Sequence, residues 1–265
     1  MFKFIILALA IAFVLIARKA KPASEKAGVG LLGPVEPTYQ PELLTVATYN
    51  IQTGKSNEGK RNLIASANVI EQADLVGIQE VYGAGFDGLF NKGQTERLAD
   101  YGKFSYLFSA TRRRWFREHR GNAILSRLVI SNWKVINLPD TSGKSFRNMT
   151  TAEVNWQGKT FHFINTHLHT RGGREDQLEI VLQEFAKYPR AIIVGDFNSR
   201  EDSKALSNAL KNIEITDAVA VAGLHHSDRI DWILSKGFNV ESGEIQEKGV
   251  SDHPYYQVSL RYANE

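Results

Sequence analysis

Residues 191–198 read AIIVGDFN, an uninterrupted apolar run that ends in glycine, aspartate and asparagine. A short apolar run bounded by turn residues predicts a strand that is buried on both faces. The preceding segment, residues 174–187, repeats apolar residues at i, i+3, i+4 and i+7 from Leu178 to Phe185. That spacing predicts a helix with one apolar face, packed on one side of a sheet.

Seven further segments of the chain have the apolar character and length of strands. They are 43–51 (LLTVATYNI), 75–81 (LVGIQEV), 123–126 (AILS), 151–156 (TAEVNW), 159–168 (KTFHFINTHL), 229–234 (RIDWIL) and 255–262 (YYQVSLRY). The strands at 151–156 and 159–168 are expected to form a hairpin through Gln157 and Gly158. Many strands with a few interleaved helices, one of them at 60–73, predict an α/β fold with two packed sheets flanked by helices, in one domain.

The first residues of the chain differ from the rest in composition. Residues 5–17 are apolar throughout, and a helix over residues 2–17 would be roughly 24 Å long, close to the thickness of a bilayer core. We expect residues 1–21 to be a membrane anchor or a signal segment, with an uncleaved anchor favoured, and the protein to sit in a bacterial inner membrane, with either side open. Residues 22–41 hold four of the seven prolines and predict a linker to the body, 42–265.

The composition is that of an ordinary globular protein of 265 residues, with 43% hydrophobic and 23% charged residues. No cysteine is present, which excludes a disulfide scaffold, thiolate catalysis and a cysteine zinc site. The net charge is +3, and residues 1–21 contribute four basic and no acidic side chains, so the remainder carries 3 − 4 = −1. A body without a basic excess argues against a protein that coats nucleic acid through its bulk charge.

Polar residues gather at or just beyond the ends of the predicted strands. They are Asn50, Glu80, Asn165, His167, Asp196, Asn198, Asp252 and His253. Each alone is better explained as a turn former or a satisfied polar group, but ligands of α/β folds bind at strand ends, where such residues would meet. The set offers carboxylate and amide oxygens without a thiol, and these favour Mg²⁺ or Mn²⁺ over zinc.

Seven motifs in this order resemble the endonuclease/exonuclease/phosphatase family, whose fold is that of DNase I. They are TYNIQTG (48–54), GIQEV (77–81), GNAILSR (121–127), INTHL (164–168), VGDFNS (194–199), DRIDWIL (228–234) and SDHP (251–254). The motifs span residues 48–254, nearly the whole body. The resemblance implies a DNase I-like four-layer α/β sandwich and a metal-dependent hydrolase of phosphate esters.

The resemblance also implies a metal site. Glu80 would be the main metal carboxylate, with Asn50 beside it on metal or phosphate and Asp252 as a further metal or supporting carboxylate. One residue departs from the pattern of apurinic endonucleases, which carry an acid where this chain has Gln52. That difference lowers the expectation of a repair nuclease of that type.

The remaining motif residues would carry the chemistry. By resemblance, Asp196 would orient or deprotonate the attacking water and Asn198 would hold a phosphate oxygen. His253 would contact the scissile phosphate, with Asp231 fixing its tautomer, and His167 would serve the leaving group or the phosphate. An aspartate beside an imidazole raises the imidazole pKa, which keeps it protonated against phosphate.

An arginine-rich segment, residues 111–120 (TRRRWFREHR), precedes the motif GNAILSR and is expected to be a loop near the substrate cleft. Arg113 and Arg114, with Trp115 between the arginines, would grip phosphates and stack a base, or sit on anionic lipid headgroups, or form a solvated basic loop. The other candidate substrate-binding residues are Asn122, Arg147 and Asn165.

These observations predict a membrane-tethered, Mg²⁺- or Mn²⁺-dependent phosphodiesterase, active as a monomer, in which water attacks the phosphorus in line. Its substrate is either nucleic acid or a phospholipid or phosphosugar, because the motifs contact only the phosphate. A phosphomonoesterase on the same scaffold and a catalytically silent phosphate-binding module are the alternatives. The complete motif set argues against the silent module.

Overall fold

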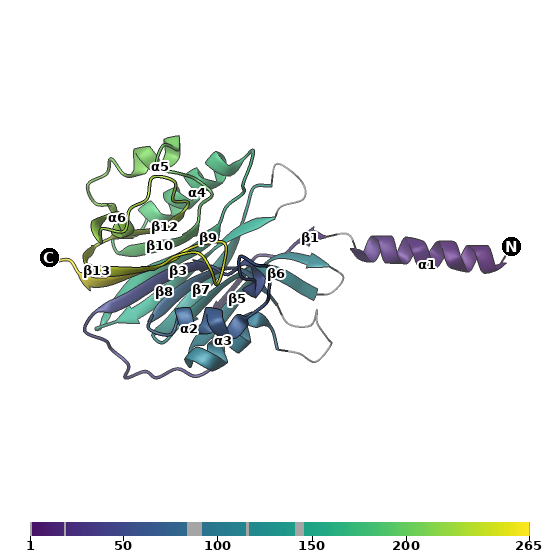
Figure 1. Ribbon diagram of the computed structural model, residues 1–265, viewed down its shortest axis with the longest axis horizontal. Coiled ribbons are helices and arrows are strands. Elements are labelled where there is room, and N and C mark those ends of the chain that lie inside the picture. Colours follow the sequence, from purple (N-terminus) through teal and green to yellow (C-terminus); the bar gives the residue numbers. More distant parts are fainter. Residues whose placement is uncertain (1, 19, 84–91, 115–116, 141–145, 265) are drawn as a thin grey trace.

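The computed structural model describes residues 2–18, 20–83, 92–114, 117–140 and 146–264. Two seven-stranded mixed sheets pack face to face within this part of the chain, and helices cover their outer faces (Figure 1). The predicted DNase I-like α/β sandwich with four layers is confirmed. The hairpin through Gln157 and Gly158 is also present, with both residues at positive φ, as a tight turn between antiparallel strands requires.

The first sheet contains the following strands in spatial order: β1 (Lys21–Pro22), β5 (Ser105–Arg114), β6 (Arg117–Ser126), β4 (Leu75–Tyr82), β3 (Leu44–Asn50), β14 (Tyr255–Tyr262) and β13 (Phe238–Gln246). The order in the second sheet is β11 (Thr216–Asp217), β12 (Asp231–Lys236), β10 (Ala191–Asp196), β9 (Lys159–His167), β8 (Arg147–Trp156), β7 (Val129–Leu138) and β2 (Lys26–Val29). The neighbours β3 and β4 are parallel, as are β9 and β10.

The helices are short and lie mostly on the outside of the sandwich. They are α1 (Phe2–Arg18), the 3₁₀ turn η1 (Gln52–Gly54), α2 (Leu63–Val69), α3 (Gln94–Gly102), α4 (Arg174–Ala186), α5 (Lys204–Ala209) and α6 (Ala218–Val221). Apolar residues of α2 and α3 pack on the first sheet, and those of α4 and α5 pack on the second (Figure 1).

Strand β10 shows why its sequence is apolar at every position. Ile192 and Val194 face the core between the two sheets, while Ala191 and Ile193 face the core under α4. Successive side chains of a strand point to opposite faces, so a strand covered on both sides needs apolar residues throughout. The polar residues then begin where the strand leaves the core, at Asp196.

Strand register brings the ends of both parallel pairs to one edge of the sandwich. Asn50, the last residue of β3, pairs with Gln79 of β4, one residue before Glu80. In the second sheet, Asp196 pairs with His167 on one side and with Asp231 on the other. The strand-end residues that the sequence singled out therefore meet at this edge.

The segment 22–41 differs from the expected free linker. Strand β1 pairs with β5, β2 pairs with β7, and Leu32 bridges to Tyr106, so this segment adds edges to both sheets. Gly30 also accepts a hydrogen bond from Trp133 Nε1 at 2.8 Å. Prolines and glycines are typical of a linker, and they led to that prediction here. Edge strands are often very short and tolerate both residues, so the same composition is compatible with strand pairing.

Helix α1 extends away from the sandwich (Figure 1). Phe4, Leu9 and Phe13 are each more than half exposed. Of the helices in the described part of the chain, none combines the length and apolar character needed to cross a membrane.

Deleting residues 1–41 should destabilise the body, whereas deleting only residues 1–18 should not. The longer deletion removes both edge strands and the side chains of Leu31 and Tyr39, which pack against the central core. Burying an apolar side chain of this size contributes about 1–3 kcal/mol, so we expect a Tm lower by about 5–15 °C. Thermal unfolding followed by circular dichroism compares the two truncations, and equal Tm values would contradict the structural role of this segment.

Candidate active site

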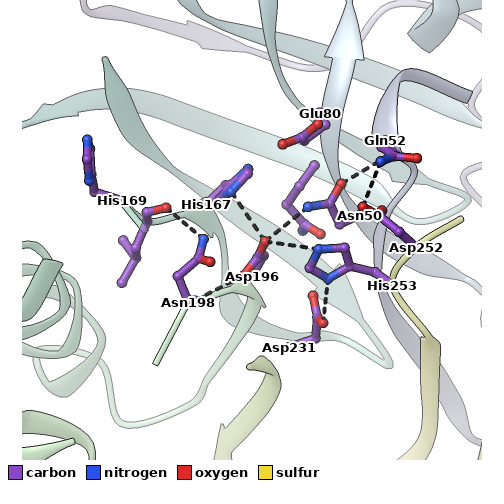
Figure 2. A network of polar contacts seen from close by, with 12 residues as sticks. Asn50, Gln52, Glu80, His167, His169, Asp196, Asn198, Asp231, Asp252 and His253 are labelled. Carbon is purple, nitrogen blue, oxygen red and sulfur yellow. Dashed lines mark hydrogen bonds and ion pairs between the residues drawn. The ribbon is translucent and has the colours of Figure 1, made fainter. Parts of the chain in front are cut away.

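The carboxylate of Asp196 lies at the centre of a polar network at the shared edge of the sheets (Figure 2). Asn50 Nδ2 donates to Asp196 Oδ2 at 3.0 Å, and His167 Nε2 and His253 Nε2 lie 3.3 and 3.7 Å from the same oxygen. The backbone N–H of Asn198 donates to Asp196 Oδ1 at 2.9 Å. A carboxylate that is only 1% exposed thus has fixed partners on both oxygens.

His253 is paired with a second buried aspartate. Its Nδ1 lies 2.8 Å from Asp231 Oδ2, which leaves Nε2 directed toward Asp196. Burial alone would lower the pKa of His253, but the hydrogen bond and charge of Asp231, followed by Asp196 and Asp252, raise it to about 9. The imidazole is therefore protonated at neutral pH.

The pKa values of Asp196 and His167, two other titratable groups of the network, are shifted in opposite directions. Burial, followed by the negative charge of Asp231, raises the pKa of Asp196 well above its ordinary value, against the lowering effect of His253. Burial, followed by the positive charges of Arg147 and His253, lowers the pKa of His167 well below its ordinary value. Asp196 is therefore a stronger base than a solvated aspartate, and His167 is neutral.

Side-chain oxygens that could bind a metal ion lie beside this network, around the start of η1. The side chain of Asn50 accepts a hydrogen bond from the backbone N–H of Gln52 at 3.1 Å, and Gln52 Nε2 donates to Asp252 Oδ2 at 2.7 Å. Figure 2 shows Glu80 beside Asn50, with Gln52 and Asp252 on the same side. Arg120 forms an ion pair with the carboxylate of Glu80.

The backbone at the site is held in unusual conformations. Of the six described non-glycine residues with positive φ, four lie here: Gln52, Thr53, Glu80 and Asn198. Glu80 has a φ of 60° in an irregular stretch of β4, between Ile78 and Val81, where the pairing with β6 shifts register. Bulges and left-handed residues change the direction of side chains. They cost conformational free energy, and such strain is often found at functional sites.

Gly195 is required by close packing next to the central aspartate. Its φ is +145°, and a Cβ there would overlap the backbone oxygen of Thr166 on β9. Glycine in the motif GDFN thus lets β10 approach β9 closely and sets Asp196 beside His167.

A small pocket of about 130 Å³ opens next to Glu80 and His167. Its remaining lining comes from Thr111, Arg112, Arg120, Gly121, Asn122, Phe146 and Arg147. Burial lowers the pKa of Arg147 to about 10, against the raising influence of Asp196 and Glu80, so the guanidinium is charged at neutral pH. Asn122 and Arg147 thus lie at the site, and their contact with substrate stays a prediction.

Asn165 is not part of the pocket, and its predicted role in substrate binding needs correction. It is fully buried, accepts from Gln79 Nε2 at 2.8 Å, and donates to the backbone oxygens of Ile78 and Ala123. All three contacts cross from β9 to the opposite sheet. Its polar side chain thus ties the two sheets together within the core.

The arginine-rich segment also differs from the expected loop, because residues 111–114 and 117–120 belong to the antiparallel strands β5 and β6. Arg113 is exposed and does not line the pocket, and the side chain of Arg114 lies outside the described part, as do Trp115 and Phe116. The neighbours Arg112 and Arg120 line the pocket instead. Strand alternation could have found Arg120, since it lies two residues before Asn122 and so shares its face.

The model of the endonuclease/exonuclease/phosphatase family matches residues 47–253. This chain belongs to that family. The match includes every residue that contributes a side chain to the Asp196 network. None of the curated proteins matches the chain significantly.

Solved structures of family members share the fold at low sequence identity. A protein from Beutenbergia cavernae DSM 12333 is 23% identical with a TM-score of 0.67, over 84% of this chain and 72% of that one. The mannosyl-6-phosphatase of Bacteroides thetaiotaomicron VPI-5482 is 18% identical with a TM-score of 0.66, over 83% and 100%. D. rerio TDP2 complexed with single-strand DNA product is 16% identical with a TM-score of 0.65, over 83% and 100%.

Members of the family act on phosphate esters and generally use divalent metals, and the donors of this chain fit such an ion. Asp196, Asp231 and His253 also lie within metal-binding distance of one another, but Asp231 and His253 are engaged with each other through Nδ1. Glu80, Asn50 and Asp252 offer hard oxygens without a competing imidazole. This second set fits Mg²⁺ or Mn²⁺ by donor chemistry.

Replacing Asp231 with asparagine should lower the pKa of His253. Since Asp231 supplies the charge that raises this pKa, the imidazolium of the variant should lose its proton at a lower pH than about 9, the value in the unaltered chain. NMR titration of the histidine ring resonances measures both values. Asp228→Asn, an exposed position three residues away, is the matched control and should leave the pKa of His253 in place. An unchanged pKa in Asp231→Asn would contradict the pairing.

Proposed function

We propose that this chain is a phosphodiesterase that uses Mg²⁺ or Mn²⁺ to direct water against a phosphate ester. The observation that carries the proposal is the Asp196 carboxylate, buried between a protonated and a neutral histidine. A base of raised pKa next to an imidazolium supplies both proton acceptor and counter-charge at neutral pH. The silent binding module, by contrast, needs neither of these shifts.

In this mechanism the chain's own residues handle one proton and the developing charge. Asp196 accepts the proton of the attacking water, and the oxygen of that water forms the new bond to phosphorus as the ester oxygen leaves. His253, held by Asp231 at 2.8 Å, hydrogen-bonds to a phosphate oxygen through Nε2. A divalent cation on Glu80, Asn50 and Asp252 would stabilise negative charge on the phosphate when bound.

His167 and Asn198 have positioning parts in the same scheme. A neutral His167 cannot act as an imidazolium donor to the leaving group, so we assign it hydrogen bonding to phosphate, one of the two roles that the resemblance implied. Asn198 donates its side-chain amide to the backbone oxygen of Leu168 at 3.0 Å, which leaves its Oδ1 and second N–H for a substrate or water.

The phosphomonoesterase remains the second candidate. The fold that this chain shares with a mannosyl-6-phosphatase favours this candidate. The fold that it shares with TDP2 in complex with a DNA product favours the phosphodiesterase. Both likenesses are at low identity, so the substrate class has to come from activity. Bis-nitrophenyl phosphate and mono-nitrophenyl phosphate separate the two candidates directly.

Asp196→Asn should reduce hydrolysis of bis-nitrophenyl phosphate by roughly 10²–10⁴-fold, the usual contribution of a general base. The full chain and the variant are assayed with Mg²⁺, with Mn²⁺ and with EDTA, and EDTA should abolish the activity of the full chain. Loss of turnover should come with unchanged circular dichroism, because asparagine is isosteric with aspartate.

Asp202→Asn, an exposed aspartate six residues further along the chain, is the matched control for this substitution and should retain full activity. Retained activity in Asp196→Asn, or activity that is indifferent to EDTA, would contradict the proposed chemistry. A preference for the monoester would select the phosphomonoesterase.

We also propose that α1 attaches the enzyme to a lipid surface. Its exposed apolar side chains motivate this, together with the basic residues Arg18 and Lys19 that follow them in the sequence. Cationic residues next to an apolar helix favour anionic headgroups. The oligomeric state is expected to be monomeric, since every residue of the proposed mechanism comes from one chain.

The full chain should co-sediment with vesicles of phosphatidylethanolamine and phosphatidylglycerol, whereas the chain lacking residues 1–18 should stay in the supernatant. The truncated chain is the matched control, because it keeps the sheets intact. Equal sedimentation of the two proteins would place any lipid contact on the body instead of the helix. Absence of both from the pellet would refute the attachment.

A further inference from the structure

The pocket beside the proposed catalytic site concentrates positive charge in a small volume. Arg112, Arg120 and Arg147 line its 130 Å³, and Glu80 is the one carboxylate of the lining. The side-chain charges therefore sum to 3 − 1 = +2 at neutral pH. Arg120 forms an ion pair with Glu80, and three guanidinium groups around one small volume still outnumber its carboxylate, so the lining favours an anionic ligand.

The backbone holds the three arginines in place. Arg112 and Arg120 are direct cross-strand partners on β5 and β6, and Thr111 Oγ1 donates to the backbone oxygen of Arg120 at 3.0 Å. Strand β1 pairs with β5 through Pro22 and Arg112 and so braces the outer side of the hairpin. Preorganised cations bind an anion with less loss of side-chain entropy than cations on a flexible loop.

Arg147 supplies a buried donor that has no partner in the described part of the chain. Its Nε is buried and has no hydrogen-bond partner among the described residues. A buried N–H without a partner costs free energy, and such groups in native structures usually have a ligand, a water or an ion. Arg147, the residue that carries this donor, is part of the lining of the pocket.

The pocket volume of about 130 Å³ accommodates a phosphate group. The polar lining residues Thr111 and Asn122 are small, and Gly121 allows the two strands of the hairpin to approach so closely that a Cβ there would overlap the backbone oxygen of Ser109. A tetrahedral anion matches both the size and the charge. A phosphomonoester carries a charge of about −1.5 to −2 at neutral pH, which complements a lining of +2.

We propose that this pocket binds a second, terminal phosphate of the substrate, next to the phosphate that is hydrolysed. The inference rests on the proposed function and narrows its substrate class to phosphodiesters that carry a phosphomonoester group close by. Glu80 and His167 line the pocket and also flank Asp196 or the oxygen donors, so the two phosphates would sit a few bonds apart. The shared chemistry is a terminal phosphate, whether on a nucleotide or on a phosphosugar.

The test compares matched nitrophenyl esters on the full chain with Mg²⁺. One pair is a nucleoside 3′-nitrophenyl phosphate with and without a 5′-phosphate, and the other is glycerol nitrophenyl phosphate with and without a second phosphate. The second phosphate should raise kcat/KM by roughly 10- to 100-fold in at least one pair, the range expected for charge-assisted hydrogen bonds. The pair with the larger ratio distinguishes the nucleotide source from the small polyol source.

Arg112→Gln should bring this ratio close to one, because it removes a pocket cation without touching the Asp196 network. Arg113→Gln, the next residue of β5, removes the same charge from an exposed position outside the pocket and should keep the ratio. Equal losses on both members of a pair in Arg112→Gln would mean that the pocket holds the scissile phosphate, and would overturn the proposal. No gain from the second phosphate in the unaltered chain would overturn it as well.

Binding separates failure of this inference from failure of the proposed function. On the Asp196→Asn variant, a nucleoside 3′,5′-bisphosphate should bind at least tenfold more tightly than the 3′-monophosphate, and adding Arg112→Gln should remove the difference. If no ester is hydrolysed but this difference is measured, the proposed function fails and the anion subsite stands. If hydrolysis of the simple esters depends on metal and the two nucleotides bind equally, the proposed function stands and the anion subsite fails.

Discussion

The hydrogen bond from Asn50 Nδ2 to Asp196 Oδ2, 3.0 Å long, joins the two sheets at the position where the site is built. Asn50 ends a strand of the first sheet and Asp196 ends a strand of the second, so neither sheet alone contains the network. Their separation is set deeper in the core, where Asn165 of β9 reaches the backbone of β4 and β6. A buried amide that satisfies all its polar atoms fixes spacing with more directional precision than apolar packing.

Electrostatic balance in the network depends on this rigid spacing. Two carboxylates, Asp196 and Asp231, are both almost fully buried, and the His253 imidazole lies between them. Burial pushes the pKa of Asp196 upward while Asp231 makes His253 a cation, so the acid–base properties of each group depend on the distance to the next. The left-handed backbone at Glu80 and Asn198 is the conformational cost of holding these distances.

The sequence carried the fold and the Asp196 network well because both depend on local pattern. Strand β10 is apolar at each position since it is covered on both faces, and the polar motif begins where the cover ends. The edges were harder to predict. Strands β1 and β2 have two and four residues, too few for any periodicity, and their pairing partners lie about 90 to 110 residues away in the sequence.

Asn165 and Arg120 show that the roles of site residues were also hard to predict from the sequence. A polar residue near a strand end fits a binding role and a core role equally well in sequence, and only the position of the facing sheet decides. Asn165 turned out to face the opposite sheet, whereas Arg120 faces the pocket from a segment whose charge density resembled a loop. Long-range contacts of this kind have no local signature in the sequence. Residue chemistry alone therefore assigned Asn165 to substrate binding and left Arg120 out of the candidate residues.

The order of the strands has a consequence for when the Asp196 network is completed during synthesis. Strand β14 inserts between β3 and β13 and follows them both in the sequence, so the first sheet stays open until residues 255–262 have been made. His253 lies just before that strand. Partly synthesised chains therefore hold Asp196 and Glu80 without His253 and with an unpaired edge on β3, which exposes them to aggregation. The strand order thus couples closure of the first sheet to completion of the Asp196 network, because both wait for the segment that contains His253 and β14.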